Sequence, residues 1–319
     1  MKNNYFMPEG NLLYSKENLS YISNLSGIER AMNENKILEA RVTMCDSELN
    51  LHVDLCGIEG IIPKNECLLT PNGETIKDIA IITRVGKPVC FKVMAIEQKG
   101  DTFCAILSRR AAQLECKNFY LSSLLPGDII DATVTHLDTF GAFVDIGCGN
   151  ISLLSIDCIS VSRISHPSDR LFAGQKLTVV VKSNDIENGR IYVTLKELLG
   201  TWEQNAENFT VGQTVSGIVR SIESYGVFVE LAPNLAGLAE LRDDRAIFYN
   251  LDVGNSVSVY IKSIIPEKMK IKLVLIDASA EAAPQTPIRY FVNTKKTEHI
   301  DLWKYSPDYC TKTVETVFG

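Results

Sequence analysis

The chain lacks a long apolar run, a paired-cysteine motif and an excess of positive charge. Its apolar runs all fall short of the roughly 18 residues that a membrane-spanning helix needs. The N-terminal stretch is rich in Asn and acidic residues and has no signal-peptide core. These absences predict a cytoplasmic protein with no membrane segment.

The nine cysteines are scattered, and none forms a C-x-x-C pair. The four histidines do not gather near cysteine pairs, so the spacing does not favour zinc. There is also no G-x-x-x-x-G-K-[ST] phosphate loop. We therefore predict buried free thiols in a reducing compartment, no metal and no cofactor.

Acidic residues outnumber basic ones by 39 to 32, which gives a net charge of −7. This balance argues against a protein that coats nucleic acid by bulk positive charge. It leaves room for a local aromatic binding face. Binding of RNA to such a face would depend only modestly on salt, because few phosphates would be neutralised.

One phrase occurs twice. Residues 140–145 read Phe-Gly-Ala-Phe-Val-Asp, and residues 225–230 read Tyr-Gly-Val-Phe-Val-Glu. The offset is 225 − 140 = 85, and the same offset links Gly127 with Gly212. A phrase repeated at fixed spacing indicates tandem copies of one small domain.

The rest of the pattern is that of strands. Apolar and polar residues alternate strictly from 49 to 55, and Asn188-Gly189 is typical of a tight hairpin turn. We predict an all-β fold of three tandem five-stranded OB-fold barrels, each of about 70 residues and joined by short helices. The last 31 residues are too aromatic for a disordered tail, and we expect them to dock on the body.

The predicted boundaries follow from this pattern. Ser26 is expected to cap a helix running to Glu39, and residues 278–288 have the composition of a flexible linker. The expected parts are an N-terminal lead-in and helix (1–34), three barrels (35–110, 124–198 and 210–277), and a linker with a C-terminal docking segment (278–319).

These residues resemble a known family. Phe-Gly-Ala-Phe-Val-Asp-Ile-Gly from residue 140, Gly-Gln-Lys-Leu at 174–177 and Asn-Gly-Arg-Ile at 188–191 resemble the S1 RNA-binding domain of ribosomal protein S1 and polynucleotide phosphorylase. The third unit matches well and the first more weakly. The resemblance covers roughly 35–277, and the layout is similar to the short ribosomal-S1-like proteins of Gram-positive bacteria. It implies single-stranded RNA binding without catalysis, and attachment to messenger RNA or the small ribosomal subunit. Three small domains on short connectors are typical of a monomer.

In this family two rings of the repeated phrase lie on the outer surface and stack on bases, which assigns Phe140 with Phe143 and Tyr225 with Phe228. Residues i and i+3 of a regular strand face opposite sides. The two rings therefore share a face only if a bulge lies between them, and Gly141 supplies the flexibility for one. The alternative is that one ring of each pair belongs to the core.

Other candidate residues come from the same comparison. Arg190 lies where the family has an RNA-contacting arginine, and Lys270 takes that place in the third unit. His136 precedes the aromatic phrase on a strand and is either an ordinary strand histidine or an RNA contact. Arg109 and Arg110 are interpreted as solvated helix charges.

Two departures from the family weaken the pattern. Where the family often has a histidine after the aromatic phrase, this chain has Ser155 in the second unit and Glu240 in the third. The first unit has no aromatic pair, because residues 49–52 occupy that stretch. It is therefore expected to serve docking or structure rather than strong RNA binding.

These residues suggest three functions to choose between. The favoured one is a non-enzymatic protein that binds single-stranded RNA in translation, through its second and third units. Two weak sites on one chain should bind long RNA better than short RNA. The alternative is a protein-interaction scaffold with little direct RNA binding, and the acidic balance favours it. A nuclease is disfavoured, because no cluster of carboxylates or histidines lies beyond the barrels.

Overall fold

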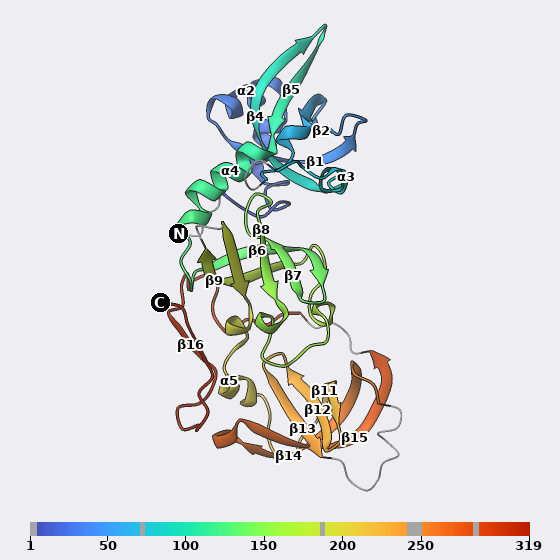
Figure 1. The fold of residues 1–319 in the computed structure, drawn as a ribbon, viewed down its shortest axis with the longest axis vertical. Helices are drawn as coiled ribbons and strands as arrows, with labels where there is room; N and C mark the ends of the chain where they lie inside the picture. Colours follow the sequence, from blue (N-terminus) through green and yellow to red (C-terminus); the bar gives the residue numbers. More distant parts are fainter. Residues whose placement is uncertain (1–4, 71–73, 186–188, 241–250, 283–286) are drawn as a thin grey trace. The chain divides into compact units, whose positions relative to one another are not determined.

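The computed structural model describes residues 5–70, 74–185, 189–240, 251–282 and 287–319. They form three closed five-stranded β-barrels and a short two-stranded ribbon (Figure 1), which confirms the predicted all-β fold of three tandem barrels. Contacts divide the chain into an N-terminal unit (residues 1–124, 131–133 and 145–151) and a C-terminal unit (125–130, 134–144 and 152–319). None of the described helices is long and apolar enough to cross a membrane.

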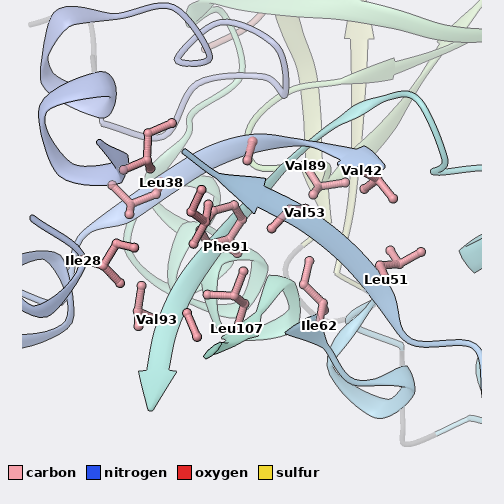
Figure 2. Packing of buried hydrophobic residues seen from close by; sticks show 14 of the residues in the cluster. Ile28, Leu38, Val42, Leu51, Val53, Ile62, Val89, Phe91, Val93 and Leu107 are labelled. Carbon is pink, nitrogen blue, oxygen red and sulfur yellow. The ribbon is translucent and has the colours of Figure 1, made fainter. Parts of the chain in front are cut away.

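The first barrel has strand order β1-β2-β3-β5-β4 and closes through the parallel pair β3 and β5. The alternation predicted at 49–55 is confirmed for 51–55, since Leu51, Val53 and Leu55 are buried while Asp54 is exposed. Leu49 instead has a positive φ and lies outside the strand. Their side chains meet Phe91 in a closely packed core (Figure 2). The strands are β1 (Ile37–Cys45), β2 (Leu51–Leu55), β3 (Ile58–Ile62), β4 (Pro88–Lys99) and β5 (Thr102–Ser108).

The helix predicted from Ser26 to Glu39 differs from the observed one. Two helices, α1 (Lys16–Ile22) and α2 (Leu25–Asn33), precede β1. The N-cap of α2 is Asn24, whose side chain accepts a hydrogen bond from the Gly27 N–H at 2.8 Å. Asparagine and serine are about equally favoured as N-cap residues, so Asn24 and Ser26 were both candidates for the start of this helix. After Asn33 the chain instead turns through Asn35, which has a positive φ, and continues as β1 from Ile37.

The second barrel has strand order β10-β8-β7-β6-β9, and the third has β11-β12-β13-β15-β14. The two orders are the same, because in each barrel the strands follow one another around the barrel as first, second, third, fifth and fourth along the chain. The second consists of β6 (Ile129–Asp138), β7 (Gly141–Asp145), β8 (Ile151–Ser155), β9 (Lys176–Asp185) and β10 (Arg190–Thr194). The third consists of β11 (Thr214–Glu223), β12 (Gly226–Ala232), β13 (Leu235–Glu240), β14 (Asn255–Ile265) and β15 (Lys270–Ala282).

Strand β15 runs five residues into the segment whose composition predicted a linker. It pairs with β14 as far as Asn255 opposite Ala282, with irregular registers along the way. Backbone pairing to a neighbouring strand therefore decides the structure of 278–282, where side-chain composition is uninformative. The predicted linker residues 283–286 lie outside the described residues.

Short helices occur between the barrel strands and between the barrels. The α-helices are α3 (Asp78–Ile82), α4 (Arg109–Phe119) and α5 (Trp202–Ala206). The 3₁₀ turns are η1 (Lys64–Glu66), η3 (Leu121–Ser123), η4 (Ile156–Cys158), η5 (Pro167–Asp169), η6 (Lys196–Leu199) and η8 (Pro266–Lys268).

The C-terminal segment packs on both barrels of the C-terminal unit. Its ribbon pairs β16 (Leu302–Lys304) with β17 (Glu315–Val317). Trp303 and Tyr305 are buried in the core of the third barrel, while Phe318 packs against Ile129 and Val180 of the second. The aromatic residues of this segment therefore contribute to the core of the unit.

Candidate nucleic-acid interface

The predicted rings of the second barrel lie together. Phe140 lies in the turn before β7 and Phe143 on that strand, with ring centroids 5.8 Å apart and planes at 89°. His136 on β6 stacks on Phe143 at 6.2 Å and 21°. Phe140 is 49% exposed and Phe143 half-buried. The three rings form one open cluster.

The third barrel repeats the arrangement. Tyr225 and Phe228 have centroids 6.2 Å apart and planes at 89°. Tyr225 is 58% exposed and Phe228 half-buried. In neither barrel is a ring of the pair part of the buried core, so the alternative that one ring of each pair is a core residue is wrong.

The proposed role of glycine in this arrangement was wrong. Gly141 and Gly226 lie within strands and do not adopt a left-handed φ. The two rings share a face because Phe140 and Tyr225 lie in the turns. Glycine is required for a different reason: a Cβ on Gly141 would lie 2.5 Å from the Leu154 carbonyl oxygen, a distance real Cβ atoms do not reach.

Replacing Gly226 with alanine tests this packing. Its Cβ would lie 2.6 Å from the Ala239 carbonyl oxygen, on backbone that cannot rotate away. We expect Gly226→Ala to reduce the stability of the third barrel by about 2–3 kcal/mol, the scale of an overpacked core. Tryptophan fluorescence during urea unfolding measures this, because Trp202 and Trp303 both pack in that barrel's core. The exposed Ser224→Ala should change stability by less than about 0.5 kcal/mol.

The strand registers define a line of outward-facing residues across each barrel, which we call the outer row. In the third barrel its register partners are Ser221 with Phe228, Phe228 with Leu238, and Leu238 with Lys272. A β-bulge lies on β11 between Val219 and Ser221, on the strand before the aromatic phrase.

The outer row of the second barrel is more aromatic. The residues that lie 85 positions before Ser221, Phe228 and Leu238 are His136, Phe143 and Leu153. Leu153 is in register with Tyr192 on the parallel strand β10. This row is therefore His136, Phe143, Leu153 and Tyr192. Sequence analysis missed Tyr192, although its place two residues after Arg190 on a predicted strand puts both on one face.

The outer row of the first barrel is mainly aliphatic, and two carboxylates flank it. It contains Met44, His52, Ile61 and Ile106, with His52 in the place of Phe143. The imidazole lies between two carboxylates: Nε2 is 3.2 Å from Asp46 and Nδ1 is 2.9 Å from Glu59. Hydrogen bonds from Asn50, and a further one from His52, lower the pKa of Asp46 to about 2. This face therefore carries negative charge, which repels phosphate.

The remaining predicted residues lie around these rows. Arg190 and Lys270 are exposed at the starts of β10 and β15, two residues before the outer row. In the part of the chain that the structure describes, neither Arg190 nor Lys270 stacks on an aromatic ring. Glu240 is exposed and pairs with Lys272 at 3.2 Å, and Ser155 is half-buried at the end of β8.

The interpretation of Arg109 as a solvated charge was wrong. Only 1% of its side chain is exposed, and its guanidinium donates from Nε and Nη2 to Glu9 at 2.6 and 3.0 Å. The sequence could not show this, because Glu9 lies 100 residues away. Among the described residues no group of His, Cys, Asp or Glu is arranged to hold a metal ion, and none of the nine cysteines, all of them described, forms a disulfide.

Residues 124–196, which include the second barrel, match the family model described as S1 RNA binding domain. The small ribosomal subunit protein bS1 of Rickettsia conorii is 31% identical over 232 residues, which cover 69% of this chain and 39% of that protein. The bS1 homolog of Bacillus subtilis is 31% identical over 69% of this chain and 57% of its own length. The bS1 of Staphylococcus aureus strain COL is 28% identical over 90% and 74%.

The chain thus spans less than two thirds of the Rickettsia relative. The similarity extends beyond the second barrel, because the Staphylococcus match covers nearly the whole chain. The second barrel thus matches the S1 RNA binding domain family, and the chain as a whole is similar to small ribosomal subunit protein bS1, including the bS1 proteins of Gram-positive bacteria.

Proposed function

We propose that this protein binds single-stranded RNA, in particular messenger RNA during translation, by stacking bases on the outer faces of its second and third barrels. It acts in the cytoplasm as a monomer, without catalysis, and associates with the small ribosomal subunit. Arg190 and Lys270 contribute contacts to phosphate or base at the ends of the two faces.

The observation that carries the proposal is the repeated ring geometry. Phe140 and Phe143 in one barrel, and Tyr225 and Phe228 in the next, present an exposed ring at right angles to a half-buried one at nearly the same separation. Exposed aromatic rings on an OB-type barrel offer flat apolar surfaces for unpaired bases. The similarity to bS1 supports RNA as the ligand.

The test is fluorescence anisotropy with a labelled single-stranded RNA of about 25 nucleotides, long enough for two barrels. The variant replaces Phe140, Phe143, Tyr225 and Phe228 with alanine. Each base stack contributes roughly 1–3 kcal/mol, so we expect at least a 100-fold loss of affinity. The matched control is Tyr14→Ala with Phe119→Ala, two rings of the N-terminal unit that are 76% and 74% exposed.

Salt dependence separates stacking from charge. Stacking predicts that wild-type affinity falls modestly with salt, since few phosphates are neutralised. If wild type and the four-ring variant bind alike with a steep salt dependence, or if neither binds, RNA stacking is not the function of these faces.

A second function, protein docking, is supported at the first barrel alone. The observation is its outer row, where His52 is held between Asp46 and Glu59 beside Met44 and Ile61. Aliphatic and acidic side chains suit a protein surface better than an RNA backbone. In this arrangement the first barrel would attach the protein to a partner and the other two would hold RNA.

A further inference from the structure

We propose that Tyr192 is a further RNA-stacking residue, which gives the second barrel one more base platform than the third. This inference rests on the proposed function and assigns a residue that the aromatic phrase does not include. It makes the second barrel the principal RNA site of the chain.

The register places Tyr192 on the same face as the other rings. Leu153 of β8 is in register with Tyr192, and in-register residues of neighbouring strands point to the same side of a sheet. A Cβ on Gly141 would lie 3.2 Å from the Leu153 side chain, so Leu153 lies against the outward side of β7, where Phe143 also points. Tyr192 and Phe143 therefore lie on either side of Leu153.

The third barrel shows where a long side chain at this position goes. Lys272 occupies the place of Tyr192, and its Nζ lies 3.2 Å from Glu240 on the neighbouring strand. A side chain at this position thus lies across the outer face. In the second barrel the corresponding neighbour of Tyr192 is Ser155, which leaves the ring without a charged group at that place.

The spacing suits a strand of RNA. Adjacent strands lie about 4.8 Å apart, so the row from His136 to Tyr192 spans about 14 Å across four strands. His136 stacks on Phe143 within this row, and Leu153 fills the space before Tyr192. The row is a continuous apolar and aromatic strip. In the third barrel, by contrast, it begins with a serine and ends in an ion pair.

The experiment measures anisotropy with a labelled single-stranded RNA of about 8 nucleotides, enough for one barrel. The full chain carries Tyr225→Ala and Phe228→Ala, so that binding reports the second barrel. In this background we expect Tyr192→Ala to weaken binding about 5- to 100-fold, the range of one base stack, with an unchanged salt dependence. Tyr192→Phe should bind as the parent does. Tyr192→Lys should bind with a steeper salt dependence, because a cation replaces the ring.

Two controls separate the inference from the proposed function. Tyr260→Ala removes an exposed tyrosine on β14, away from the outer row, and should not change affinity. Phe143→Ala tests the proposed function in the same assay. If Phe143→Ala loses binding and Tyr192→Ala matches Tyr260→Ala, the inference is wrong and the proposed function stands. If the parent binds no RNA, or Phe143→Ala has no effect, both are wrong.

Discussion

Replacing Glu9 with glutamine is expected to reduce the stability of the N-terminal unit by about 3–5 kcal/mol, the cost of removing one partner from a buried ion pair. The Glu9 carboxylate accepts two hydrogen bonds from Arg109 and one from the Cys90 N–H at 3.1 Å, and Arg84 lies 3.6 Å away. Without the carboxylate, the buried guanidinium of Arg109 keeps its charge and loses its counterion.

The pKa of Glu9 also reflects the interaction of its carboxylate with Arg109. Burial alone would raise it, but the charge and hydrogen bonds of Arg109 outweigh burial and hold the pKa below its ordinary value of 4.5. A lowered folded-state pKa means that the stabilisation is complete above about pH 4.5 and is lost as the pH falls through the folded-state value. Glu9→Gln should remove this acid sensitivity from the N-terminal unit.

The positions of the two tryptophans allow the unfolding of the two units to be told apart. Trp202 and Trp303 both lie in the C-terminal unit, so their fluorescence does not report the N-terminal unit. Glu9→Gln should move the urea transition seen by far-ultraviolet circular dichroism and leave the fluorescence transition in place. Asp78→Asn, which removes an exposed pair with Lys64, should change stability by less than about 1 kcal/mol. Equal effects of the two variants would contradict the importance of burial.

The barrel fold was predictable because its signals are local. Strict alternation in β2 and the two aromatic phrases each depend on a few consecutive residues. The turn predicted at Asn188-Gly189 begins outside the described residues. The 85-residue offset then extended the prediction from one barrel to the next. The ring pairs were predictable for the same reason, since both rings of each pair belong to one phrase.

What the sequence did not reveal depends on contacts between distant segments. Arg109 resembles any helix arginine until Glu9 is placed against it. Tyr192 joins the ring face only through the parallel pairing of β10 with β8, which no local pattern encodes. The role of Gly141 was misassigned because its constraint is the carbonyl oxygen of Leu154 on a neighbouring strand.

A long RNA is expected to bind the wild-type chain about 100-fold or more tightly than a short one, because the second and third barrels act together. The third barrel and most of the second lie in one compact unit, while residues 131–133 and 145–151 of the second barrel belong to the N-terminal unit. Glu230 of the third barrel accepts hydrogen bonds from Arg170 of the second at 2.8 and 2.5 Å and from Arg220 at 2.7 Å, and all three are buried. This junction links the two barrels, so that the ring face of one barrel is tethered to an RNA bound at the other.

The measurement compares RNAs of about 8 and 30 nucleotides, which fill one barrel and both barrels. A longer strand also offers more binding registers, which raises affinity without any cooperation. The variant Tyr225→Ala with Phe228→Ala has a single ring site and measures this statistical gain alone. If the barrels cooperate, the increase in affinity from the short to the long RNA should be about tenfold or more larger for wild type than for this variant. Equal gains would mean that the barrels bind RNA independently, and the junction through Glu230 would then serve stability alone.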